Sequence, residues 1–336
     1  MLLIAIILLV GLYLAWNIGA NDLANSMADV VGSGVLPLRR VILYAGIADF
    51  LGAVIFGSRV TKTVAKGIIP IEMIDPHLAL LGLLSATFAA ASWVMIATYF
   101  ELPVSTSHSV VGAMLGFGLF SVFKKAIEFN QIEWGVLIKI VSSWILSPVA
   151  GALVAFLLLF LIRKFLIERS KDINRLERIF GYLLIASSCY IAFSHGSNDV
   201  ANAIGPVAAA VEISNLSIPL RALTALGGVG IVIGVATWGY KVIETVGTKI
   251  TNLVPSSGFA ADISTASVVL FCSYLGLPVS TTHTLVGSIV GVGLSKGISA
   301  VNMGVVKEIV ISWLITIPIP LIIAFCLSGG LVYLGV

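Results

Sequence analysis

Charged residues are scarce in this chain of 336 residues: they make up 10% of it, against 59% hydrophobic residues. A typical soluble domain is about one quarter charged. Several apolar runs also exceed the ~18 residues that mark a membrane span. The composition excludes a soluble protein and predicts a multi-pass protein of the lipid bilayer, in the cell (inner) membrane.

Cysteines and basic runs are equally scarce. Cys189, Cys272 and Cys326 stand alone within apolar runs, so the sequence offers no disulfide framework and no metal-ligand spacing. The net charge is only +3, and no long basic run indicates nucleic acid as a partner. Residues 1–15 lack the basic region and the cleavage site of a secretory signal, so we expect them to open the first span.

The two halves of the chain repeat each other in three places and in the same order. "GANDLAN" (19–25) matches "GSNDVAN" (196–202), and "WGVLIKIVSSW" (134–144) matches "MGVVKEIVISW" (303–313). "LPVSTSHSVVGAMLGFGL" (102–119) and "LPVSTTHTLVGSIVGVGL" (277–294) are identical at eleven of eighteen positions. Ordered matches of this kind indicate a duplicated unit, which is common among membrane transporters.

A hydrophilic stretch, residues 163–178, separates the two halves. It holds six Lys or Arg residues against three acids, so the positive-inside rule places it in the cytoplasm. Its length allows an amphipathic helix along the membrane surface. We therefore expect a first membrane repeat over 1–162, a cytoplasmic linker over 163–178 and a second membrane repeat over 179–336.

Hydropathy predicts five apolar segments in each half. They cover 1–34, 40–60, 78–101, 103–122 and 131–165, then 179–211, 219–244, 258–276, 278–295 and 304–334. The segment 131–165 would be about 52 Å long as a helix, against a ~30 Å hydrocarbon core. It must tilt, kink at Pro148 or make two passes.

Two junctions leave no room for a loop in water: Leu102-Pro103 and Leu277-Pro278. Proline ends the preceding helix, so the two arms around each junction predict a re-entrant hairpin. Because a hairpin crosses nothing, an odd number of crossings in each half would insert the second half upside down. The expected fold is an all-α polytopic membrane protein with two inverted-topology repeats and both termini outside.

The first matched motif places carboxylates and amides at membrane depth, where ionisable groups cost roughly 2.5–3.5 kcal/mol. Gly19 and Gly196 would allow each first helix to unwind there, so we expect a broken first helix in each repeat. Exposed carbonyls and side-chain oxygens would then suit Na⁺, or a proton on a carboxylate. The alternative is an Asn-Asp N-cap at an interfacial turn. The candidate cation ligands are Asp22, Asn25, Asp199 and Asn202, with Asn21 and Asn198 beside them.

The second matched motif follows each proline with hydroxyl residues. Ser and Thr are good N-caps, and the first turn of a helix attracts anions through unpaired N–H groups and the helix dipole. Two such turns, related by the repeat, can converge on one tetrahedral oxyanion; the alternative is hydroxyl bonding to the helix backbone. The candidate anion ligands are Ser105, Thr106, Ser107, Ser280, Thr281 and Thr282.

Other polar residues have weaker claims to a role in the site. His108, His283 and His195 lie beside the motifs and are candidate proton relays, although structural hydrogen bonding is the commoner role. Four acids have no counterpart in the other half, and they are Asp29, Asp49, Glu212 and Asp262.

The charges of the two motifs suggest ion coupling. Two carboxylates with a divalent oxyanion would carry about −4 in a low-dielectric pocket, and neither motif contains Lys or Arg to offset it. Cations or protons from solution must therefore supply positive charge, so anion and cation strengthen each other's binding. This reciprocity is what a symporter requires.

At these residues the chain resembles the inorganic phosphate transporter (PiT) family. "GANDLANS" and "GSNDVANA" are similar to its signature, with Leu23 and Ser26 as conservative departures, and "PVST" occurs in both halves. The resemblance implies cation-coupled phosphate uptake, an inverted repeat, a site where signature helices meet hairpins, and a homodimer. The resemblance also covers family members that use H⁺ or carry sulfate.

The expected function is secondary active transport: sodium-coupled symport of inorganic phosphate, with no enzymatic activity and no resident cofactor. Asn21, Asp22, Asn198 and Asp199 would join the hydroxyl residues around phosphate. A proton-coupled phosphate or sulfate permease of the same fold is the alternative within this class. An intramembrane aspartyl protease would require a carboxylate pair ~3 Å apart, and an anion channel would ignore ion gradients.

Overall fold

A computed structural model describes residues 1–32, 34–100, 104–239, 254–297 and 314–335, together with Gly304, Lys307 and Ile311. Within these residues the chain is helical and contains no strand. In the described part of the chain, eight helices are long and apolar enough to cross a membrane, or up to nine spans if a bent pair counts as one. The expected all-α polytopic fold is confirmed.

The helices follow the hydropathy segments, with shifted ends. The first half contains α1 (Leu2–Gly32), α2 (Leu38–Ile55), α3 (Gly57–Lys66), η1 (Ile71–Met73), α4 (Pro76–Tyr99), α5 (Thr106–Phe123), η2 (Phe129–Gln131) and α6 (Trp134–Ile162). The second half, after η3 (Arg163–Ile167), contains α7 (Ile173–Ile213), α8 (Leu220–Thr237), α10 (Pro255–Tyr274), α11 (Thr281–Lys296) and α13 (Pro318–Tyr333).

Two local expectations need correction, and one open alternative, for the segment 131–165, is decided. The segment 40–60 is not one helix, because the chain bends by 62° between α2 and the helical stretch that begins at Gly57. Helix α6 runs through Pro148 without interruption, so it makes one pass and not two. The stretch 163–178 is no separate surface helix, since η3 extends α6 and the first residues of α7 complete it.

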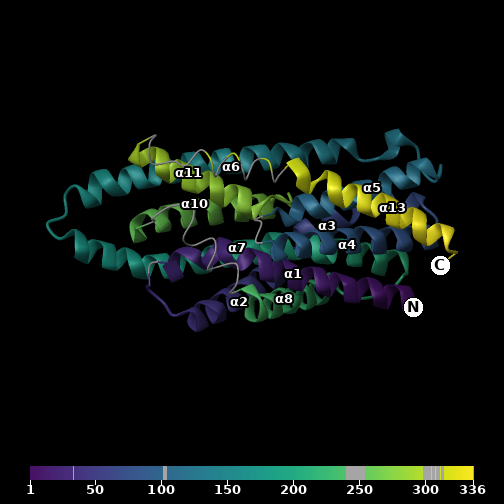
Figure 1. Cartoon of the computed structure of the whole chain (residues 1–336), viewed down its shortest axis with the longest axis horizontal. Helices are drawn as coiled ribbons and strands as arrows, with labels where there is room; N and C mark the ends of the chain where they lie inside the picture. Colours follow the sequence, from purple (N-terminus) through teal and green to yellow (C-terminus); the bar gives the residue numbers. More distant parts are fainter. Residues whose placement is uncertain are drawn as a thin grey trace.

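The repeats are inverted. In Figure 1, α1 starts at the N-terminus on the right and runs left, whereas its counterpart α7 starts at the far left and runs right. The pair α4–α5 lies towards the right and the pair α10–α11 towards the left, so the two hairpins approach the middle from opposite ends (Figure 1). Their breaks fall at 100–105, of which 101–103, with Pro103, lie outside the described residues, and at 275–280.

The signature helices are unbroken, contrary to expectation, because their glycines serve close packing. A Cβ atom on Gly19 would lie 2.0 Å from the carbonyl oxygen of Ile231 in α8, and one on Gly196 would lie 2.0 Å from that of Asp49 in α2. Both α1 and α7 continue as α-helix through these positions. Each signature helix thus crosses the second helix of the other repeat at backbone contact, which interleaves the halves around one core.

Candidate functional site

Both signature segments lie inside long helices, and their aspartates are buried. Asp22 in α1 and Asp199 in α7 are 3% and 2% exposed. Asn202, one helical turn beyond Asp199, is completely buried. Carboxylates at this depth require partners, and the hairpins provide them for Asp199.

The second arm of each hairpin begins with a capped helix. Ser105 precedes α5 and accepts a hydrogen bond from the N–H of His108 at 3.2 Å, and Ser280 does the same for His283 ahead of α11. The two breaks touch, because Ser107 Oγ donates to the carbonyl of Val279 at 2.9 Å. The repeats therefore bring two helix N-termini to one place, as the sequence predicts.

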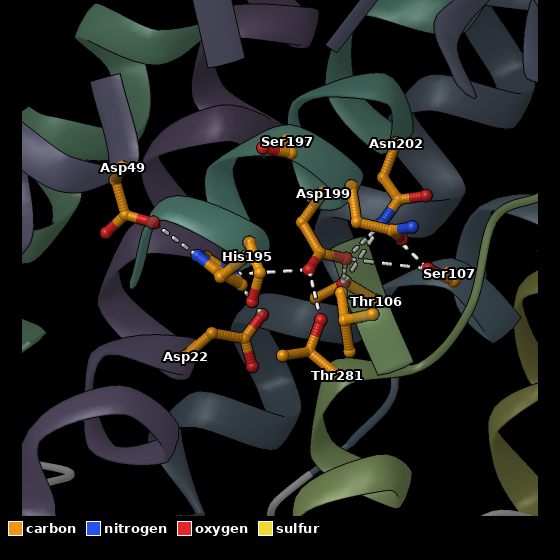
Figure 2. Close-up of polar contacts among 12 residues, drawn as sticks. Asp22, Asp49, Thr106, Ser107, His195, Ser197, Asp199, Asn202 and Thr281 are labelled. Carbon is orange, nitrogen blue, oxygen red and sulfur yellow. Dashed lines mark hydrogen bonds and ion pairs between the residues drawn. The ribbon is translucent and has the colours of Figure 1, made fainter. Parts of the chain in front are cut away.

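Asp199 receives hydrogen bonds from both hairpins (Figure 2). Thr106 Oγ1 of the first hairpin donates to Asp199 Oδ1 at 3.2 Å, and Ser107 Oγ lies 3.5 Å from the same oxygen. Thr281 Oγ1 of the second hairpin donates to Asp199 Oδ2 at 2.6 Å, while Asn202 Nδ2 donates to Oδ1 at 2.8 Å. Hydroxyl residues that are far apart in the sequence thus meet at one carboxylate.

The first asparagine of each motif donates a hydrogen bond to the first arm of the hairpin in its own repeat. Asn21 Nδ2 donates to Thr98 Oγ1 of α4 at 2.8 Å, and Asn198 Nδ2 donates to Ser273 Oγ of α10 at 3.0 Å. Asn198 Oδ1 also accepts from the N–H of Val279 at 3.3 Å. These amides hold the hairpin arms, so in this conformation their bonds go to protein groups; their role as phosphate ligands stays a prediction.

His195 lies between carboxylates from three helices. Its Nδ1 is 2.6 Å from Asp49 Oδ1, and its Nε2 is 3.4 Å from Asp22 Oδ2 and 3.5 Å from Asp199 Oδ2 (Figure 2). From the sequence, Asp49 is a weak candidate because it has no acidic counterpart in the other half. The signal that finds it is its place on α2, where Gly52 and Asp49 face α7 at the close crossing.

The remaining candidate residues lie at different places in the fold. Thr282 is buried in the first turn of α11, whereas the side chain of Asn25 lies outside the part that the structure describes. His108 and His283 pack edge to face, with ring centroids 4.4 Å apart. Asp262 accepts from Ser187 and Ser188 elsewhere on α7, Glu212 pairs with Lys66, and Asp29 packs near Gly258.

The chain matches known phosphate transporters over nearly its whole length. The model of the "Phosphate transporter family" matches residues 18–324. A Pyrococcus furiosus protein that carries the name of a phosphate permease is 38% identical over 99% of this chain and 97% of its own. Inorganic phosphate transporter 2-1, chloroplastic, of Arabidopsis thaliana is 38% identical over 93% of this chain and 69% of its own.

A solved structure is similar as well. "The sodium-dependent phosphate transporter" superposes with a TM-score of 0.90 at 38% identity, covering 99% of this chain and 100% of the other. These relatives are transporters and not enzymes, which removes the protease alternative and confirms a multi-pass membrane protein. The matched residues 18–324 contain both signature motifs and both hairpins, and this chain belongs to the phosphate transporter family.

Proposed function

We propose that this protein takes up inorganic phosphate by symport with sodium ions. The observation that carries the proposal is the convergence on Asp199, where hydroxyls from both hairpins meet the carboxylate of a signature helix. Side chains of both repeats meet there in one buried cluster, and alternating access of two halves around a fixed binding site requires such a meeting point.

The oxygen atoms around Asn202 support a sodium site. Three of them, Asp199 Oδ1, Thr106 Oγ1 and Ser107 Oγ, lie 2.8, 3.2 and 3.0 Å from Asn202 Nδ2. Asn202 Oδ1 is buried and has no hydrogen-bond partner among the described residues. A half-turn of the amide would point Oδ1 at these oxygens and form a ring of hard oxygen ligands. Such a ring suits Na⁺, whereas a lone proton does not need so many oxygen ligands. The name of the solved structure also supports sodium.

The two capped helix N-termini support an anion site. Helices α5 and α11 begin beside the carboxylate cluster, and each is at least sixteen residues long. Their first turns offer N–H groups and the positive end of the helix dipole, which suit a phosphate oxyanion. An anion next to Asp22 and Asp199 binds well only when cations offset these charges, so the geometry supports coupled binding.

Uptake into proteoliposomes tests the proposal. Purified protein is reconstituted, and labelled phosphate or sulfate is offered under a sodium gradient or a proton gradient imposed separately. We expect phosphate to accumulate with the sodium gradient alone. Accumulation with only the proton gradient, or equal accumulation of sulfate, would identify the permease alternative, and flux indifferent to both gradients would identify a channel. The variant Glu168→Gln, which removes an exposed carboxylate, serves as the control.

The homodimer, the sodium ligands and the cytoplasmic position of 163–178 remain predictions. Light scattering in detergent measures the oligomeric state. Labelling of single cysteines in the linker from one side of the membrane measures its orientation.

A further inference from the structure

Helix α3 carries its basic residues on one side. Arg59, Lys62 and Lys66 follow one another at intervals of three and four residues, which places them on one face of the helix, and all three are exposed. The opposite face contains Val60 and Val64, which are completely buried. Basic side chains are costly in hydrocarbon, so such a face inside a membrane protein indicates contact with water.

This basic face runs from the level of the candidate site to the end of α7. At its start, a Cβ atom on Gly57 would lie 2.4 Å from a methyl carbon of Val200, the residue after Asp199. At its end, Lys66 forms an ion pair with Glu212. Glu212 lies thirteen residues beyond Asp199, which is about 20 Å along α7. Helix α3 therefore leads from the depth of the site towards one membrane face.

The inner end of the basic face touches the break of the second hairpin. Arg59 Nη1 donates to the carbonyl oxygen of Tyr274 at 3.0 Å, and the guanidinium carbon lies 4.4 Å from the centre of the Tyr274 ring. A Cβ atom on Gly276 would lie 3.3 Å from Thr63 Oγ1. The same break leads into Ser280 and the capped start of α11. The basic face thus ends beside one of the two helix N-termini that suit an anion.

The outer end of the basic face opens into a cavity of about 730 Å³. The cavity is lined by α3, by the end of α7 and by the turn that leads into α8, and its charged residues are Lys62, Lys66 and Glu212. The charge of Lys66 is offset, because Lys66 pairs with Glu212 and lies 3.3 Å from Glu72. Lys62 has no ion-pair or hydrogen-bond partner within the described ranges. The cavity therefore presents one uncompensated cation, which favours an anion as its occupant.

We propose that this cavity is the outer vestibule of the transporter, where Lys62 binds phosphate before the anion moves along α3 to the hairpin break. The proposal rests on the proposed symport and adds the route of entry. Helix α7 starts after the segment 163–178 and ends at the cavity, so a cytoplasmic 163–178 places the cavity outside (Figure 1). Charge inside a cavity raises the local concentration of ions of opposite sign, and salt screens this effect.

Two substitutions of opposite sign test the charge of the vestibule. Lys62→Gln removes the unpaired cation, and Glu212→Gln removes the acid that lines the same cavity. At low ionic strength and constant sodium, we expect KM for phosphate to rise about tenfold in Lys62→Gln and to fall about threefold in Glu212→Gln, with the maximal rate unchanged. Both differences should shrink in about 1 M choline chloride, where charges are screened beyond about 3 Å. Lys62→Arg should keep the wild-type KM.

A purely structural role for these side chains would give losses of the same sign in both variants, independent of salt. That result would overturn the proposal, as would an unchanged KM in Lys62→Gln. The sodium dependence of uptake is measured in parallel on the wild type, so a failure of sodium coupling is recognised separately from a failure of the vestibule.

Cysteine labelling tests the vestibule without transport. In a chain whose three cysteines are replaced by serine, Ser217→Cys places a thiol at an exposed position that lines the cavity. Intact cells are treated from outside with a negatively or a positively charged methanethiosulfonate. We expect the negative reagent to react about tenfold faster, and dissolved phosphate to slow it. The matched control adds Lys62→Gln, which should abolish the preference.

Three outcomes of the labelling would overturn the proposal. Equal rates for the two reagents would show that the cavity does not attract anions. Reaction from the inner side alone would place the cavity at the wrong membrane face. A preference for the negative reagent without protection by dissolved phosphate would identify a lipid headgroup, and not the transported anion, as the ligand of Lys62.

Discussion

The charge of Asp199 gives the sharpest test of the site. Asp199→Asn keeps the shape of the side chain and most of its contacts. The amide oxygen can still accept from Asn202 and Thr106 on one side, and on the other the new NH₂ can donate to Thr281, whose hydroxyl accepts as well as donates. We therefore expect the variant to fold and the change to be confined to the charge.

The magnitude follows from the lost attraction between a carboxylate and a bound cation. At about 4 Å and an effective dielectric constant of about 20, one pair of unit charges contributes roughly 4 kcal/mol. This corresponds to about a thousandfold weaker sodium binding. The structure makes the high-dielectric limit inappropriate, because Asp199 is only 2% exposed.

Sodium titrations of phosphate uptake in proteoliposomes measure the effect. In Asp199→Asn we expect sodium-driven uptake to vanish over the accessible range, with Asp22→Asn behaving alike. Glu168→Gln should titrate as the wild type does. Near-normal sodium dependence in a folded Asp199→Asn protein would refute the assignment of this carboxylate to cation binding.

Three further changes test how the site is held together. Gly196→Ala places a methyl group 2.0 Å from a carbonyl of α2 and should cost about 1–3 kcal/mol in thermal unfolding in detergent; Gly135→Ala, with nothing within 4 Å, is its control. Asn198→Ala combined with Ser273→Ala in a double-mutant cycle should reveal a coupling of about 1 kcal/mol, and additive effects would contradict a stabilising hydrogen bond between Asn198 and α10. Ser280→Ala should lower stability by about 1 kcal/mol through the lost cap, which hydrogen exchange at the start of α11 would locate.

The sequence predicts those features whose cause is local. A proline followed by Ser and Thr ends one helix and caps the next, so the second hairpin and both capped arms could be foreseen. The duplication showed that such features come in pairs. The bend between α2 and α3 falls at Gly57-Ser58, a glycine–serine pair of the kind found at helix kinks, but such a pair inside an apolar run is a weaker signal than a proline.

Features that depend on how two helices cross cannot be predicted from the sequence of one helix. A glycine in a polar segment is compatible with unwinding and with close packing, and only the position of the partner helix decides between them. At Gly196 the partner is the backbone of α2, which also carries Asp49 to His195. The same crossing therefore explains why α7 is unbroken at Gly196 and why Asp49 lies beside His195.

An inverted repeat reaches its opposite-facing state when each half adopts the conformation of the other. Hydroxyl contacts with a carboxylate survive that exchange, because Asp22 stands where Asp199 does and each hairpin offers a threonine, Thr106 or Thr281. The contacts of His195 would be lost in that exchange, because the first repeat has Ile18 at the corresponding position, directly before Gly19. We therefore expect the two end states of the proposed transporter to differ in the surroundings of the His195 imidazole, and a difference in energy between them should be sought there.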